Sequence, residues 1–217
     1  MRLSIAISIA LLVMSTAAPG DFRNKEYELN IANPADAHYK IDTGQSRFMV
    51  RAFAGGLLSS IAGHDHNIAI KQFSGDVHFT YGSVEPASMQ MTIKADSLAI
   101  TDKVSDSDRQ KIESTMRDEV LEVGKYPEIS FKTSSISAAK LEEGKFTAKL
   151  NGELTLHGAT HPLTVTATLD FGQNLLHARG QFGIRQSTFG IKQVSVAGGT
   201  VKVKDDLKFS FDIVAHP

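Results

Sequence analysis

Two histidines set close together are the residues of this sequence with the clearest capacity for chemistry. His64 and His66 follow Gly63 and flank Asp65. On a strand, side chains two positions apart share a face, so both rings could reach one metal ion while Asp65 points the other way. Two histidines alone do not make a zinc or copper site, and the chain has no cysteine to add a thiolate. The candidate third ligands are His38, His78, His157 and His161.

The same two histidines allow two other roles. They could form a polar rim, or they could hydrogen-bond the head group of a bound quinone or phosphate. His157 and His161 flank a short turn at 158–160 and are interpreted as exposed turn residues. The sequence has no G-x-S-x-G nucleophile motif, no H-E-x-x-H zinc motif and no phosphate-binding loop. We therefore expect a protein that is not an enzyme and needs no cofactor.

The elements that position these residues are predicted to be strands, because apolar and polar residues alternate along most of the chain. The clearest case is 145–171, where two alternating runs flank the turn at 158–160. Side chains on a strand alternate between faces, so this pattern predicts a hairpin with one apolar and one polar face. Further runs of this kind cover 46–53, 57–70, 73–81, 89–95, 129–133, 177–185 and 201–214. Short strands joined by short turns favour an antiparallel barrel or sandwich.

One segment breaks the strand pattern and is predicted to be a single helix from Ser105 to Glu122. Ser105 and Asp108 resemble a capping box, and the acidic residues at its start suit the positive end of a helix. Its apolar residues recur every fourth position and are interpreted as a buried stripe, not as a ligand surface. They are Ile112, Met116 and Val120.

The beginning of the chain indicates export. An apolar run at 3–14 follows Met1-Arg2 and precedes small residues at 15–17, which is typical of a signal peptide cleaved after Ala17. A membrane anchor is the alternative, although the run is short for a membrane span. Residues 18–37 are polar and predict a tether before a domain at 38–217. We expect a periplasmic location, and no transmembrane segment in the mature chain.

Composition narrows the classes of partner. The formal net charge is −1, from 23 basic and 24 acidic residues, so there is no basic excess to neutralise nucleic-acid phosphates. Without cysteine there can be no disulfide, and stability must come from the core. We therefore expect no nucleic-acid partner, and a homodimer is left open.

Four motifs in this order resemble those of YceI-like polyisoprenoid-binding proteins. Residues 39–42 match their opening, and 73–75 match an F-x-G motif before a strand. Residues 125–131 resemble the K-Y-P-x-x-x-F signature, and 152–163 resemble the G-x-L-T-x-x-G-V-T-x-P-V hairpin. The R-D-x-H-L motif usual before the K-Y-P segment is absent, which leaves any role of its Arg and His in doubt here. The resemblance extends over about residues 38–215.

This resemblance implies an all-β fold, an eight-stranded antiparallel lipocalin-like barrel with one short helix packed on it, holding an isoprenoid chain. A barrel of eight strands has room for filling side chains or for one small ligand. The pattern places small residues on the inner face, which would leave room for a ligand unless they only relieve crowding where strands bend. These are Gly75, Ala148, Gly152, Ala167, Ala178 and Gly180.

The expected ligand site has an apolar wall and a polar end. The wall is predicted from Phe48, Val77, Leu150, Leu154, Val165, Phe182 and Phe209, and the polar end from His64, His66 and Arg117. The leading hypothesis is an exported, non-enzymatic protein that binds or carries an isoprenoid or quinone-like lipid. One alternative is a metal-dependent periplasmic enzyme or redox partner that uses His64 and His66. The other is an interaction module whose barrel is packed solid.

Overall fold

The computed structural model describes residues 36–56, 64–80, 83–172, 174–196 and 200–217 of the chain. The expected signal peptide at 1–17 and the tether up to residue 35 lie outside the described residues, as does part of the predicted run at 57–70. The first strand begins at Asp36, two residues before the expected start of the domain. No helix in the described part of the chain is long and apolar enough to cross a membrane.

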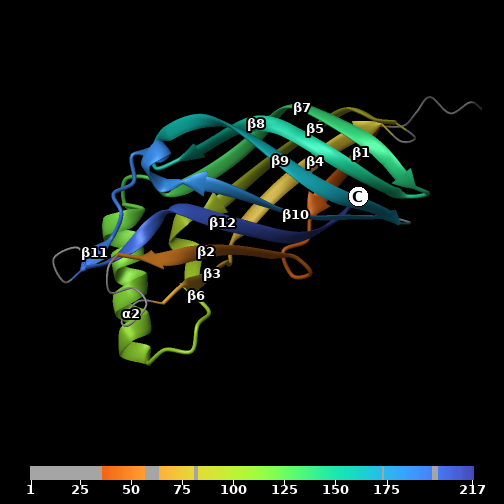
Figure 1. Cartoon of the computed structure of the whole chain (residues 1–217). Coiled ribbons are helices and arrows are strands. Elements are labelled where there is room, and N and C mark those ends of the chain that lie inside the picture. Colours follow the sequence, from red (N-terminus) through yellow and green to blue (C-terminus); the bar gives the residue numbers. More distant parts are fainter. Residues whose placement is uncertain (1–35, 57–63, 81–82, 173, 197–199) are drawn as a thin grey trace, which may run out of the picture. The chain divides into compact units, whose positions relative to one another are not determined.

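The described residues form an all-β barrel with one α-helix (Figure 1). The helical elements are η1 (Ala95–Ser97), α2 (Asp106–Thr115), the π-helical turn η2 (Met116–Val120) and η3 (Gln186–Phe189). The strands are β1 (Asp36–Ile41), β2 (Arg47–Gly55), β3 (His66–Ile70), β4 (Phe73–Thr80), β5 (Ser83–Lys94), β6 (Leu98–Ile100), β7 (Glu128–Glu142), β8 (Lys145–Leu156), β9 (Ala159–Gly172), β10 (Leu175–Arg185), β11 (Ser195–Val196) and β12 (Val201–His216).

Six of these strands combine into three long, interrupted ones. β1 and β2 both pair with the same edge of β12. Next to them, β4 pairs with β1 and β3 pairs with β2. In the same way, β5 pairs with β4 and β6 pairs with β3. Counted in this way, the barrel has eight strands, and β1–β12 pairing closes the ring. The order is β1/β2, β3/β4, β5/β6, β7, β8, β9, β10, β12, and these pairings are antiparallel. The predicted fold class is confirmed.

Local chemistry explains where strands break and turn. Between β1 and β2, a carboxylate oxygen of Asp42 accepts the backbone N–H groups of Gly44 and Gln45 at 2.9 and 3.2 Å, which fixes a tight turn. Between β8 and β9, the two turn residues His157 and Gly158 have φ angles of 52° and 74°. Positive φ at both central positions suits a two-residue hairpin turn. The turn therefore lies at 157–158 and not at the predicted 158–160.

The predicted helix and its cap are confirmed. Ser105 Oγ accepts the backbone N–H of Asp108 at 3.1 Å and donates to the Asp108 carboxylate at 2.6 Å. The helix α2 covers Asp106–Thr115 and passes directly into η2, which ends at Val120. Figure 1 shows α2 at one end of the barrel, and it contacts β6 there.

The helix occupies a place where the sheet lacks a strand. Within the described residues, β6 pairs with β3 on one edge and with no strand on the other. Side chains of α2 take the place of a partner strand there. Glu113 Oε1 accepts the backbone N–H of Ile100 at 3.0 Å, and Arg109 donates to the carbonyl groups of Ile100 and, at 2.9 Å, Asp102. Charged helix side chains thereby satisfy the backbone groups of a strand edge.

Candidate ligand cavity

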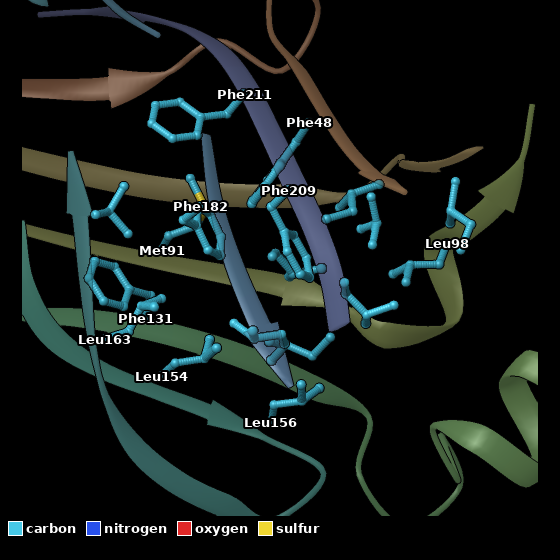
Figure 2. A pocket seen from close by; sticks show the side chains of 18 of the residues that line it. Phe48, Met91, Leu98, Phe131, Leu154, Leu156, Leu163, Phe182, Phe209 and Phe211 are labelled. Carbon is cyan, nitrogen blue, oxygen red and sulfur yellow. The ribbon is translucent and has the colours of Figure 1, made fainter. Parts of the chain in front are cut away.

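The barrel is hollow. A cavity of about 840 Å³ lies inside it, lined by residues from the strands around the ring and from α2 (Figure 2). Pockets for small molecules typically measure about 300–1,000 Å³, so this one lies in the upper part of that range. The alternative of a solidly packed barrel is therefore wrong.

The wall of the cavity is built from the apolar faces of the strands. All seven residues predicted for the wall line it, namely Phe48, Val77, Leu150, Leu154, Val165, Phe182 and Phe209. Strand alternation explains this outcome, since every second residue of a barrel strand faces inward. That these side chains contact a ligand stays a prediction.

Phenylalanine rings cover one side of the wall. Phe182 and Phe209 are stacked, with ring centroids 4.8 Å apart and an interplanar angle of 6°. Phe48 meets Phe209 edge-on at 6.1 Å. These three rings come from β2, β10 and β12 and gather in one part of the pocket (Figure 2). They present an apolar surface without hydrogen-bonding groups.

The small inward residues divide into two kinds. Ala148, Ala167 and Ala178 line the cavity, and Ala148 pairs directly with Ala167 across β8 and β9. The glycines do not enlarge the cavity in the same way, because a neighbouring side chain occupies the space beside each of them. A Cβ added to Gly180 would lie 2.6 Å from Phe211 Cζ, and one added to Gly152 would lie 2.8 Å from Phe131 Cζ. For these glycines the relief of crowding is the better explanation.

Polar residues that line the cavity gather toward its α2 end, which we call the polar end. They are His64, His66, Asp108, Lys111, Thr115, Ser130, Gln186 and Lys202. The opposite part of the wall is apolar and borders a second cluster formed by Tyr39, Phe79, Phe171, Leu176 and Ala215. The cavity therefore combines a long apolar body with polar groups at one end.

His66 is held in place by a carboxylate. Its ring nitrogen Nδ1 lies 3.1 Å from Asp102 Oδ2, and both side chains are largely shielded from solvent. Asn67 donates its backbone and side-chain N–H groups to the same carboxylate, the side-chain bond measuring 2.9 Å. Burial alone would raise the pKa of Asp102, but the hydrogen bonds from Asn67 and His66 outweigh it and lower that pKa. Asp102 is thus an ionised acceptor beside the cavity.

Asp65 points away from the two histidines, as the alternation predicts. It accepts the backbone N–H of Ala54 at 3.0 Å and pairs with Arg51 at 2.8 Å. These two partners, Ala54 first, lower the pKa of Asp65. The rings of His64 and His66 lie 6.1 Å apart and edge-on. In the described part of the chain, no three His, Cys, Asp or Glu side chains are placed to hold a metal ion.

The helix contributes to the site differently from the prediction. Ile112, Met116 and Val120 line the cavity, so the stripe interpreted as buried forms part of the cavity wall. The physical reason is that α2 packs over a hollow barrel instead of a filled one. That the stripe is not a ligand surface stays a prediction. Arg117, predicted at the polar end, lies outside the cavity wall, where its guanidinium lies 3.7 Å from Glu113. Its contact with a ligand stays a prediction.

Sequence reasoning missed several polar residues of the site. Asp108 and Thr115 lie four residues before and three after Ile112, so helical periodicity could have placed them on the same face. No comparable signal marked Gln186, which is buried and donates to the carbonyl of Lys204 at 2.8 Å. It lies in η3, a short helix that follows β10.

The two turn histidines are less exposed than predicted. His157 Nε2 lies 2.7 Å from Glu122 Oε2, and its ring packs on Tyr126 with centroids 4.5 Å apart. His161 meets the ring of Phe189 edge-on at 5.2 Å. The turn is covered because the segment after η2 and the helix η3 both pack on it.

Comparison with known proteins agrees with this geometry. The YceI-like domain family matches residues 39–215. A UPF0312 protein of Pseudomonas putida (strain W619) is 30% identical over 135 residues, which are 62% of this chain and 62% of that protein. A UPF0312 protein of Pseudomonas syringae pv. syringae (strain B728a) is 29% identical over 148 residues, 65% of this chain and 70% of that protein. The chain thus matches about three fifths of the length of the first of these relatives.

Solved structures show the same fold. BcnA of Burkholderia cenocepacia aligns with a TM-score of 0.61 and 20% identity, covering 80% of this chain and 98% of that one. A polyisoprenoid binding domain from Saccharophagus degradans aligns with a TM-score of 0.58 and 11% identity, covering 82% and 97%. At these identities the structures support the fold alone. Because the family match extends over nearly the whole barrel, this chain belongs to the YceI-like family.

Proposed function

We propose that this protein binds a lipid with an isoprenoid-type tail, with the tail in the apolar body of the cavity and the head group at the polar end. The observation that carries the proposal is a cavity of about 840 Å³ whose polar lining residues gather at one end. A relative of the same fold is described as a polyisoprenoid binding domain, which supports the same ligand class.

The energetics favour such a ligand. Each buried methylene contributes about 0.8 kcal/mol, so one five-carbon unit contributes on the order of 3 kcal/mol. Association costs at least several kcal/mol. A tail of three or four units therefore gives useful affinity without hydrogen bonds. This function requires no catalytic group, and we propose a non-enzymatic carrier that is exported to the periplasm, as its first residues suggest.

Native mass spectrometry tests the proposal directly. Protein purified from its own host is expected to carry a bound apolar molecule, which organic extraction then releases for identification. A second arm replaces Ala148, which is fully buried in the wall, by phenylalanine. Ala148→Phe is expected to weaken the binding of geranylgeraniol, because the added ring occupies part of the volume that the tail would fill.

The matched control for this variant is Thr147→Phe. Thr147 is the neighbour of Ala148 on β8, and its side chain belongs to the opposite face of the strand. It should leave uptake unchanged. Equal uptake by both folded variants, or a stoichiometric metal ion in place of a lipid, would rule out the proposed function. In the second case, loss of the metal in His64→Ala plus His66→Ala would favour the metal-dependent alternative.

A further inference from the structure

The arrangement of His66 and Asp102 bears on which head group the cavity accepts. Ile68 of β3 and Ile100 of β6 are direct cross-strand partners. His66 and Asp102 lie two residues further along on each side, so they continue the same inward-facing row. Ile68, Ile100 and His66 all line the cavity. The imidazole is therefore the first polar group reached along this row of the wall.

The carboxylate determines which ring nitrogen of neutral His66 carries the proton. An ionised carboxylate can only accept hydrogen bonds, so the Nδ1 atom that lies 3.1 Å from Asp102 must be the one that bears hydrogen. The other nitrogen, Nε2, then carries a lone pair. Among the residues that the structure describes, Nε2 has no hydrogen-bond partner. It is available to accept one.

We propose that Nε2 of His66 is a hydrogen-bond acceptor for the ligand, so that the cavity selects lipids ending in a hydroxyl group over those ending in an ether or carbonyl oxygen. This inference rests on the proposed function, because it assumes that the tail occupies the apolar body. The chemical class is a prenyl alcohol or the reduced, quinol form of a quinone. An ether or ketone oxygen facing Nε2 would place two acceptors together, and both would lose their water without gaining a partner.

The helix α2 supports the proposed role of His66, because it helps to hold Asp102 in place. Arg109 of α2 donates to the backbone carbonyl of Asp102 at 2.9 Å, while Asn67 donates to its side chain. Asp102 is thus fixed by its backbone and by its side chain. A rigid partner of this kind keeps an imidazole in one tautomer and one orientation.

Two ligands with the same tail separate this inference from the proposed function. Geranylgeraniol and its methyl ether differ only in the terminal O–H group. At pH 8, we expect the alcohol to bind about tenfold more tightly than the ether. Tight and equal binding of both would overturn the inference and leave the proposed function intact. Failure of both to bind would overturn both.

The variant Asp102→Asn is expected to remove this preference. The amide oxygen of asparagine is needed by the Asn67 donors, so its NH₂ group would face Nδ1 of His66. This forces the hydrogen onto Nε2 and turns it into a donor. The preference for the alcohol should then be lost, because a hydroxyl oxygen and an ether oxygen can both accept from Nε2–H. The ¹⁵N chemical shifts of the His66 ring should report the exchanged tautomer. An Nε2-protonated ring in the unaltered protein would contradict the inference even if this variant failed to fold.

The chain offers a matched control in a second His–Asp pair. His38 Nε2 lies 2.8 Å from Asp76 Oδ1, on two side chains that are about half exposed and do not line the cavity. Asp76→Asn should leave the alcohol preference and the His66 ring shifts unchanged. A change equal to that of Asp102→Asn would mean that net charge, not the tautomer, sets the preference, and would overturn the inference.

Discussion

Whether a small residue on the inner face of the barrel enlarges the cavity depends on the side chains beside it. Ala148 and Ala167 face each other across β8 and β9 and leave open volume, whereas Gly180, the next residue along this row, is covered by the ring of Phe211. The ring of Phe211 would have to move if Gly180 carried a side chain. Glycine at this position is thus required by contact and not by backbone conformation.

Replacing Gly180 by alanine is expected to destabilise the protein. The added Cβ would lie 2.6 Å from Phe211 Cζ and 2.5 Å from the backbone oxygen of Thr166. Overpacking of this kind costs about 1–3 kcal/mol, which thermal unfolding would detect. Gly183→Ala on the same strand is the control, because its Cβ would meet the Leu207 oxygen at an ordinary 3.4 Å. Equal melting temperatures for the two variants would contradict this explanation.

The sequence predicted which residues face the inside of the barrel where apolar and polar residues alternate regularly. Alternation placed Leu150, Leu154 and Val165 on the inner face, and all three line the cavity. Alternation does not show which neighbour covers a glycine, because that depends on the register between strands. The register between β9 and β10 places Gly180 opposite Ala167, and pairing with β12 places Phe211 beside it. Neither pairing can be read from one strand.

Among the elements, α2 contacts the edge of a strand and also forms part of the cavity wall. One side of it satisfies the free edge of β6 through Glu113 and Arg109, and another side places Ile112 in the cavity wall, which Met116 of η2 continues. None of the residues of α2 itself is fully buried. The helix therefore contacts the barrel through hydrogen bonds to strand backbone and through the partly buried Ile112.

Removing the acceptor at position 113 tests this attachment. Glu113→Ala leaves the backbone N–H of Ile100 without its carboxylate partner, which should cost about 1–3 kcal/mol. Amide hydrogen exchange at Ile100 should accelerate more than exchange in β8. Glu119→Ala is the control, since Glu119 is exposed in η2 and is not in the cavity wall. Unchanged exchange at Ile100 would show that the helix is held by other contacts.

Helices and strands could be predicted from the sequence where several residues of a segment follow the same pattern. The cap at Ser105 and the long hairpin of β8 and β9 were visible because several residues agree in each case. β6 has three residues, too few for alternation to be recognised. The apolar stripe of α2 indicated a covered face, but amphipathicity does not say whether a core or an empty cavity lies beneath it.

The whole molecule depends on contacts between distant parts of the chain. β1 near the start of the barrel pairs with the end of β12, Lys40 opposite His216, and this pairing closes the ring. Periodicity predicted strands but did not by itself distinguish a barrel from a sandwich, and the YceI-like motifs supplied that choice. The interruptions at 42–46, 71–72 and 95–97 then explain why eight barrel strands are seen as a larger number of short ones.

The finite length of the cavity leads to a prediction about tail length. Inward residues of β8 extend from Ala148 to Leu156, about 27 Å along the strand at 3.4 Å per residue. With a strand tilt of about 40°, this corresponds to roughly 20 Å along the barrel axis. Tail segments within this length bury new apolar surface with each added unit.

Affinity should therefore rise with the number of isoprene units and then level off. While the tail still fits, each unit contributes on the order of 3 kcal/mol before ordering costs, so the dissociation constant should fall at least tenfold per unit. Once the apolar body is full, further units remain in water and add little. Titrating prenyl alcohols of two to eight units by calorimetry checks this, with Ala148→Phe expected to level off at a shorter tail. A steady rise through all lengths would contradict a tail confined to a path of roughly 20 Å along the barrel axis.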